Sequence, residues 1–140
     1  GTGGPSKMKG HFFLVDFRGQ ASISGIHSFA VTPKGASFDI KDPQKFAWGV
    51  LATDVEFGPD GSLYVLDWLF GWGQTDKGRI YKISDPAVAR SREVKETQAL
   101  IAAGMDKRSE AELAKLLAHA DQRVRQEAQF RLVELKAGKR

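Results

Sequence analysis

The chain has 140 residues, with 21 Lys and Arg against 17 Asp and Glu, an apolar fraction of 41% and no cysteine. These fractions are typical of a folded chain with one modest core, or with two small units that share one, and they exclude disorder of the whole chain. The absence of cysteine excludes disulfides, thiolate metal sites, a cysteine nucleophile and haem attachment through C-x-x-C-H. Because no apolar run is long enough to cross a bilayer, we expect no membrane span.

The net charge of +4 is spread along the chain. Residues 1–91 hold ten Lys and Arg and nine Asp and Glu, a net +1, and residues 92–140 hold eleven and eight, a net +3. No window is a basic run, and dispersed charge is typical of a solvated surface rather than of a phosphate-binding stripe. The sequence therefore predicts no nucleic-acid partner.

The composition changes near residue 86. Thirteen of the 15 Gly, eight of the nine Phe, and all Trp and Pro precede residue 92, whereas Ala, Leu and Glu dominate after it. The first set is typical of short strands and tight turns, and the second set of helices. We therefore expect an α+β chain, with a β domain at 1–86 and a helical segment at 87–140.

Apolar runs bounded by turn residues recur at short intervals in the β domain. Pro33-Lys34-Gly35 and Gly58-Pro59-Asp60-Gly61 predict turns, because Pro presets the bend and Gly accepts a positive φ. Residues 42–49 have a looser pattern and are expected to be irregular. The pattern predicts six short antiparallel strands in two groups of three, at residues 11–17, 26–32, 36–40, 51–57, 62–67 and 79–83.

The helical segment carries start and stop signals for helices. Residues 92–103 form one expected helix, which ends at Gly104. Ser109 is an expected N-cap, and Glu112 three residues later completes a capping box. A last helix is expected over 122–135, where apolar residues recur on one stripe and complete a helical hairpin with the helix before it.

This hairpin resembles a HEAT repeat. The resemblance rests on E-L-x-x-L-L at 112–117 and D-x-x-V-R-x-x-A-x-x-x-L at 121–132, and it covers about 109–136. Asp121 and Arg125 match the Asp and Arg that tie stacked neighbours together in that family, while Ala120 stands where Pro is frequent. Since one repeat cannot bury its own apolar face, the hairpin is expected to pack on the β domain, on a partner or on further repeats.

The β domain resembles part of a β-propeller of the soluble quinoprotein glucose and sorbosone dehydrogenase type. The matching residues are G-H-F-F-L-V-D-F-R-G at 10–19, T-D-V-E-F-G-P-D-G-S-L-Y-V-L-D-W at 53–68 and G-R-I-Y-K-I at 78–83. With the HEAT-like segment, they resemble exported "membrane-bound dehydrogenase" proteins, in which HEAT repeats and a c-type haem domain follow the propeller. The resemblance implies two incomplete blades in a fragment of a larger protein.

Two incomplete blades leave strand edges that must be covered. The resemblance implies that the rest of a propeller covers them and that HEAT or haem domains are further partners. A homo-oligomer, formed through the exposed strand edges, is the alternative. The resemblance also implies a periplasmic or extracytoplasmic location, although the first five residues are not a signal peptide.

In the family resembled, the longer loops between strands bind pyrroloquinoline quinone, Ca²⁺ and sugar. Arg and Lys can pair with carboxylates of the quinone, and an indole can stack on its ring. Asp54 and Asp67 flank two of the expected strands and are the candidate Ca²⁺ ligands, but they lack the dense oxygen spacing of an EF-hand loop, and capping of a loop amide is the alternative. For the cofactor-binding residues, packing or local ion pairing is the alternative; these residues are Arg18, Gln20, Trp48, Trp68, Trp72 and Lys77.

The three His residues are scattered, and none has a catalytic partner at short spacing. No nucleophile-elbow, Walker or dinucleotide-binding motif occurs. We therefore expect no catalytic residue in this chain, and a role as scaffold and as one wall of a dehydrogenase-like site. The alternatives are a non-catalytic module that binds protein or glycan, and a small β-plus-α protein that forms homo-oligomers.

Overall fold

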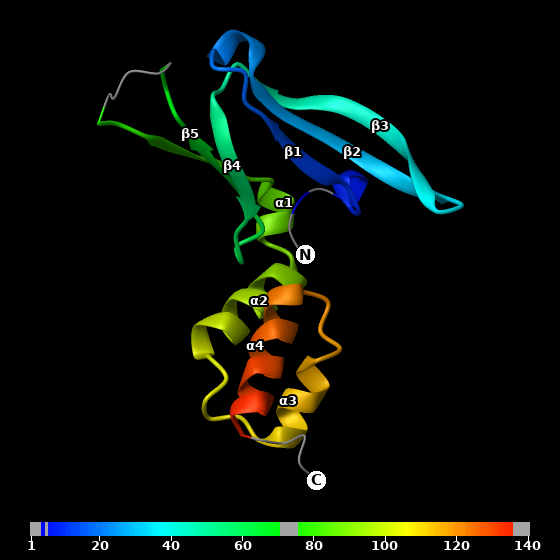
Figure 1. Cartoon of the computed structure of the whole chain (residues 1–140). Coiled ribbons are helices and arrows are strands. Elements are labelled where there is room, and N and C mark those ends of the chain that lie inside the picture. The colour runs from blue at the N-terminus through cyan, green and yellow to red at the C-terminus, as the bar shows by residue number, and fades with distance from the viewer. Residues whose placement is uncertain (1–3, 5, 71–75, 136–140) are drawn as a thin grey trace. The chain divides into compact units, whose positions relative to one another are not determined.

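The computed structural model describes residues 4, 6–70 and 76–135 (Figure 1). Its six strands are β1 (Phe12–Asp16), β2 (Gly25–Lys34), β3 (Ser37–Trp48), β4 (Ala52–Phe57), β5 (Leu63–Asp67) and β6 (Arg79–Ile83). Its α-helices are α1 (Pro86–Ala89), α2 (Arg92–Ala103), α3 (Glu110–Leu116) and α4 (Gln122–Glu134), and its 3₁₀ turns are η1 (Ser6–Met8) and η2 (Ala21–Ile23). None of the helices in the described ranges is long and apolar enough to span a membrane.

The strands form two three-stranded antiparallel sheets, ordered β1-β2-β3 and β4-β5-β6. The connections from β2 to β3 and from β4 to β5 are short turns, which are enough to join antiparallel neighbours, whereas longer loops join β1 to β2 and β5 to β6. Gly35 and Gly61 take positive φ values of 58° and 75° in two of the turns, a conformation that glycine adopts without steric cost. The prediction of an α+β chain with two groups of three strands is confirmed.

Strand β3 is longer than the sequence predicts. Residues 42–48 continue the ladder with β2, with Gln44 opposite Ser28 and Trp48 opposite Gly25. The prediction that residues 42–49 are irregular is therefore wrong for this segment. Two register shifts between the strands, at Ile26/His27 and Ser28/Ala30, each take up one extra residue of β3 and let the pairing resume. β3 is the outer strand, where Pro43 is tolerated because its missing N–H costs no bond to a further neighbour.

The chain divides into two compact units. One consists of Gly4–Glu56 and Leu63–Ile83 and contains both sheets, and the other combines the Phe57–Ser62 turn with the helices from residue 84 onward. A Cβ added to Gly61 would lie 3.0 Å from Cγ2 of Val94, which places this turn directly against α2. The sequence predicts a boundary at 86/87. In the structure the helical unit begins at residue 84 and also includes the turn at Phe57–Ser62.

Each unit buries its own apolar residues. In the sheet unit, Ile26 of β2 and Val65 of β5 are at most 1% exposed, together with Leu51 before β4. The core of the helical unit consists of Met105, Leu113, Val124 and Ala128, with Leu100, Ile101, Leu116 and Leu132 packed around it. The expected stripe on the last helix therefore supplies Val124 and Ala128 to this core, with Leu132 packed against it.

Ser109 begins α3 with the expected capping box. Its hydroxyl oxygen accepts a hydrogen bond from the Glu112 amide at 3.3 Å, and the Glu112 carboxylate accepts one from the Ser109 amide at 2.8 Å. The Ser109 amide and hydroxyl donors hold the pKa of Glu112 below its usual range. The capping box satisfies amides at the helix start that have no partner within the helix.

Ser109→Ala is expected to lower the free energy of unfolding of the helical unit by about 1 kcal/mol, the usual cost of a lost N-cap. Urea denaturation followed by circular dichroism at 222 nm measures it. Ser84→Ala changes an exposed serine outside the helices and is the matched control. Equal stability of the two variants would contradict the capping role.

The α3–α4 turn is organised around Asp121. This residue is fully buried, caps α4 through the Arg123 amide at 3.0 Å and pairs with the Arg123 guanidinium at 2.7 Å. Nη1 of Arg123 donates to the Phe57 carbonyl at 2.5 Å, so one side chain joins α4 to the β4–β5 turn. Arg125 donates to the carbonyls of His119 and Ala120 in the turn between α3 and α4. Asp121 and Arg125, the two residues that match the HEAT repeat pattern, thus both have partners within the helical unit.

Candidate functional site

The loops predicted to bind a cofactor gather at one end of the sheets. β1, β3 and β5 end there, β2, β4 and β6 begin there, and residues 49–51 connect the two sheets (Figure 1). The Gly49 amide donates to the Ser24 carbonyl at 3.0 Å, and the Trp68 amide donates to the Leu51 carbonyl at 2.9 Å. These bonds fix the connection within the sheet unit.

Most of the cofactor-binding residues predicted from the sequence lie at this end. Arg18 and Gln20 follow β1, Trp48 ends β3, Trp68 follows β5, Lys77 precedes β6, and Trp72 lies outside the described residues. Gln20 and Lys77 are exposed, and Trp68 is 46% exposed. The meander topology therefore brings together residues that are far apart in sequence.

An ion-paired cluster begins at the last residue of β1. Nε and Nη2 of Arg18 donate to the two carboxylate oxygens of Asp16 at 2.8 Å each, a bidentate arrangement. Nε2 of His27 lies 3.0 Å from the Asp16 Oδ2 atom. The hydrogen bonds from Arg18, and then from His27, lower the pKa of Asp16 to about 2. Asp16 therefore stays ionised and orients both neighbours.

Trp48 extends this cluster across the sheet. Its ring lies edge-on to His27 with a centroid distance of 5.1 Å, and the Lys45 ammonium lies 4.2 Å from the centroid of Trp48. Arg18 and Trp48, two of the predicted site residues, thus belong to one cluster of Asp16, Arg18, His27, Lys45 and Trp48. We call it the β-end cluster.

Sequence reasoning missed His27 because its partner lies on another strand. Leu14 is opposite His27 and Asp16 is opposite Gly25, so Asp16 and His27 are diagonal neighbours on one face. Cross-strand alignment of 11–17 with 26–32 is the signal that could have found the pair. The Asp16–His27 pair is an imidazole held by a carboxylate, and such a pair can orient a ligand or accept a proton.

The ionised state of Asp16 predicts a pH dependence of stability. Because its pKa is lowered in the folded chain, the carboxylate stabilises the fold above its unfolded pKa, and this stabilisation is lost as the pH falls from about 4 towards 2. The difference in unfolding free energy between the parent chain and Asp16→Asn is therefore expected to shrink across that range. Urea denaturation at several pH values measures it, with Asp39→Asn at an exposed ion pair to Lys34 as the control. A difference between parent and Asp16→Asn that stays constant from pH 5 to 2 would contradict the role given to Asp16.

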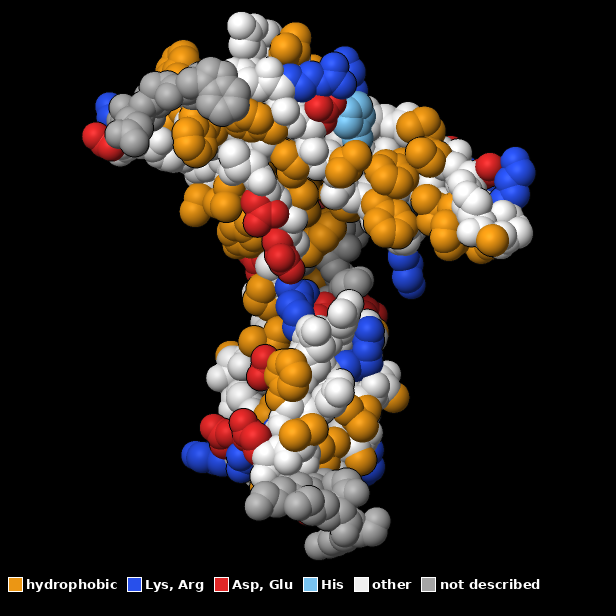
Figure 2. Space-filling model, viewed as in Figure 1, with side chains coloured by type: hydrophobic (Ala, Val, Ile, Leu, Met, Phe, Trp, Pro, Cys, Tyr) orange, Lys and Arg blue, Asp and Glu red, His pale blue; other side chains and the backbone are white. Residues whose placement is uncertain are grey.

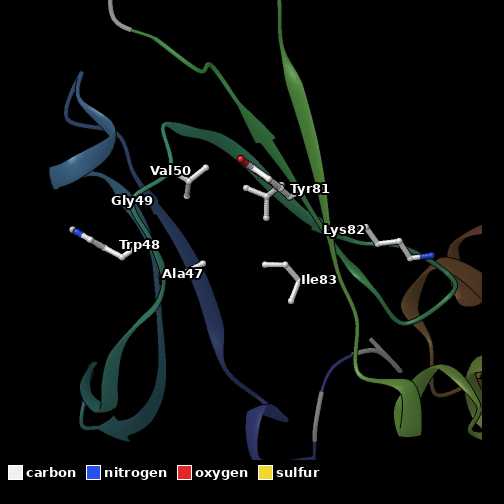
Figure 3. Close-up of a pocket in the computed structure, with 8 residues that line it drawn as sticks. Ala47, Trp48, Gly49, Val50, Tyr81, Lys82 and Ile83 are labelled. Carbon is white, nitrogen blue, oxygen red and sulfur yellow. The ribbon is translucent and has the colours of Figure 1, made fainter.

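An apolar hollow of about 260 Å³ lies between the two sheets. Figure 3 shows the side chains of Val50, Tyr81 and Ile83 pointing toward it, whereas those of Trp48 and Lys82 point away. The indole of Trp48 therefore belongs to the β-end cluster, on the other side of its strand. The hollow has apolar walls and one phenol, so it suits apolar side chains better than a charged cofactor.

The two predicted calcium ligands each bind a nearby backbone amide. Asp54 Oδ1 accepts from the Val55 amide at 2.8 Å, and Asp67 Oδ1 accepts from the Leu69 amide at 3.0 Å. Across residues 4, 6–70 and 76–135, no group of three or more His, Asp and Glu side chains is arranged to hold a metal ion. Since Ca²⁺ takes six to eight oxygen ligands, the described residues do not fit a calcium site by themselves.

Comparison with known proteins adds no identification: the sequence matches no family model, no curated protein and no solved structure.

Proposed function

We propose that this chain forms one wall of the cofactor and substrate face in an oxidoreductase of the quinoprotein sugar or alcohol dehydrogenase type, and otherwise acts as scaffold. The observation that carries the proposal is the gathering of Arg18, Gln20, Trp48, Trp68 and Lys77 at one end of the two sheets. The sequence resemblance to propellers of that type supports it, as does the division of the strands into two three-stranded meanders.

The residue types at this end fit a planar, anionic quinone. Trp68 exposes 46% of its surface and offers a ring for stacking, while Arg18 and Lys45 place cations beside the loops. Arg18 uses Nε and Nη2 to bind Asp16, which leaves its Nη1 group for a carboxylate of a ligand. A bound quinone would accept the two electrons released in alcohol oxidation, and the residues described here would orient it. This role would place the protein outside the cytoplasm, as in the family resembled.

Titration with pyrroloquinoline quinone tests the proposal, followed by tryptophan fluorescence with and without Ca²⁺. Trp48 and Trp68 lie at this end of the sheets, so their emission reports on binding there. Saturable quenching is expected. Arg18→Gln is expected to weaken binding about tenfold, because it removes a charge-assisted contact to a carboxylate.

Lys34→Gln is the matched control, since it removes one cation from the opposite end of β2. It should leave the binding curve unchanged. Absence of saturable quenching, with or without Ca²⁺, would contradict the cofactor role and leave the scaffold role alone. Equal weakening by both variants would point to nonspecific charge attraction.

A second function, a non-catalytic binding module, is favoured by the exposed apolar face of the first sheet. Phe12 and Leu14 of β1 are each 54% exposed, and Phe38 and Ile40 of β3 are 62% and 63% exposed. Figure 2 shows hydrophobic side chains gathered over these strands. Contiguous apolar surface of this kind marks interaction sites. Fluorescence quenching by an oligosaccharide, with none by the quinone, would favour this alternative.

A further inference from the structure

The two sheets have four outer strands, and two of these carry features that prevent pairing with another chain. β3 contains Pro43 and the cations Lys41 and Lys45, and its ladder with β2 has two register shifts. β4 carries Asp54 and Glu56. Proline, charge and bulges on an outer strand discourage edge-to-edge association.

The other two outer strands lack proline and differ in charge. β1 has the sequence Phe-Phe-Leu-Val-Asp, and its one charged residue is the terminal Asp16. β6 has the sequence Arg-Ile-Tyr-Lys-Ile, with two cations and no acid. Both strands have five residues, and every residue of β6 is exposed. Their lengths match, and their charges are opposite.

We propose that β1 of one copy pairs with β6 of a second copy of this chain, in antiparallel register. The order would then be β4-β5-β6 of one copy followed by β1-β2-β3 of the next, a continuous six-stranded antiparallel meander. In the register that sets Asp16 opposite Arg79, Phe12 lies opposite Ile83 and Leu14 opposite Tyr81. The acid at the end of β1 then faces the cation at the start of β6.

This register also covers apolar surface. Side chains opposite one another in a sheet share a face, so Phe12 and Leu14 join Tyr81 and Ile83, which line the apolar hollow. Phe12 and Leu14 are each 54% exposed in the isolated chain, and Ile83 is 37% exposed. Pairing removes these groups from water and adds main-chain hydrogen bonds along both outer strands.

The contact joins two different surfaces, so each copy keeps one further β1 or β6 edge. Such a heterologous interface closes into a ring or continues as an open chain. We therefore expect light scattering to give a mass that rises with concentration above 15.4 kDa, the mass of one chain. Constant mass of one chain up to millimolar concentration would overturn the proposal.

Charge reversal tests the strand pair. Arg79→Glu places an acid opposite Asp16 and is expected to weaken association at least tenfold. Lys34→Glu makes the same change in net charge at the far end of β2 and should leave association unchanged. Equal weakening by both variants would assign the association to net charge and overturn the pairing of β1 with β6.

Cysteine crosslinking gives a second test, which is independent of the charge change. Because the chain has no cysteine, every crosslink reports on an introduced pair. Leu14→Cys and Tyr81→Cys are mixed as separate variants under mild oxidation, and a heterodimer is expected because opposite Cβ atoms lie within reach of a disulfide. The control is Leu14→Cys mixed with Ile40→Cys, because Ile40 lies on β3, the outer strand that carries Pro43 and two lysines. A heterodimer that forms as readily in the control would overturn the assignment.

Discussion

Asp121→Ala is expected to lower the free energy of unfolding of the helical unit by about 3 kcal/mol, because the change leaves Arg123 without its buried counter-ion. Asp121 is fully buried and Arg123 exposes 26% of its side chain. The same substitution removes the N-cap of α4, since Asp121 Oδ1 accepts from the Arg123 amide at 3.0 Å. It also releases the guanidinium that holds the Phe57 carbonyl.

Urea denaturation followed by helical circular dichroism measures this loss. Asp106→Ala is the matched control, because Asp106 is 90% exposed and its oxygen lies 3.9 Å from the Arg131 guanidinium. An exposed ion pair of this kind contributes at most about 1 kcal/mol. A loss for Asp121→Ala no larger than that of the control would contradict the role of Asp121 at the centre of the α3–α4 turn.

Gly25→Ala is expected to destabilise the sheet unit by about 3 kcal/mol, at the upper end of the cost of overpacking. A Cβ at this position would lie 2.4 Å from the Ala47 carbonyl oxygen and 2.6 Å from Cε3 of Trp48. The carbonyl belongs to the backbone of β3 and cannot rotate away. β3 must therefore shift at the point where Gly25 pairs with Trp48.

Two measurements follow from this prediction. Urea denaturation gives the loss of stability, and tryptophan emission is expected to change because the Trp48 ring must move from its place beside His27. Gly78→Ala is the matched control, because nothing lies within 4 Å of its added Cβ and its φ is not positive. A Gly25→Ala variant as stable as the control would contradict the close approach of β3 to β2.

The sequence predicted most local features because they depend on neighbouring residues. The Ser109 capping box, the helix that ends at Gly104 and the Gly61 turn arise from contacts within a few residues. The extension of β3 to Trp48 could not be predicted in this way. It depends on bulges in β3 that restore the pairing with β2 on the far side of an outer-strand proline.

The candidate site was predicted by residue type and not by partner. Arg18 and Trp48 stand out as a cation and an indole near loops, but their link through Asp16 and His27 crosses two strand pairs. Similarly, Asp121 matches a HEAT-like motif, while its pairing with Arg123 rather than Arg125 depends on the approach of the Phe57 carbonyl. For the sheet residues, strand register and bulges decide which side chains become partners.

By itself, the sequence determined the α+β composition, the two groups of three strands and the starts of α2, α3 and α4, because patterning and turn chemistry act over short distances. Only the tertiary structure decided where the β4–β5 turn packs, since Gly61 meets Val94 across more than thirty residues. It likewise decided that Asp16 orients His27 and that β1 and β6 are outer strands. These features depend on contacts between distant segments, which form only when the strands have chosen their register and each unit has closed around its core.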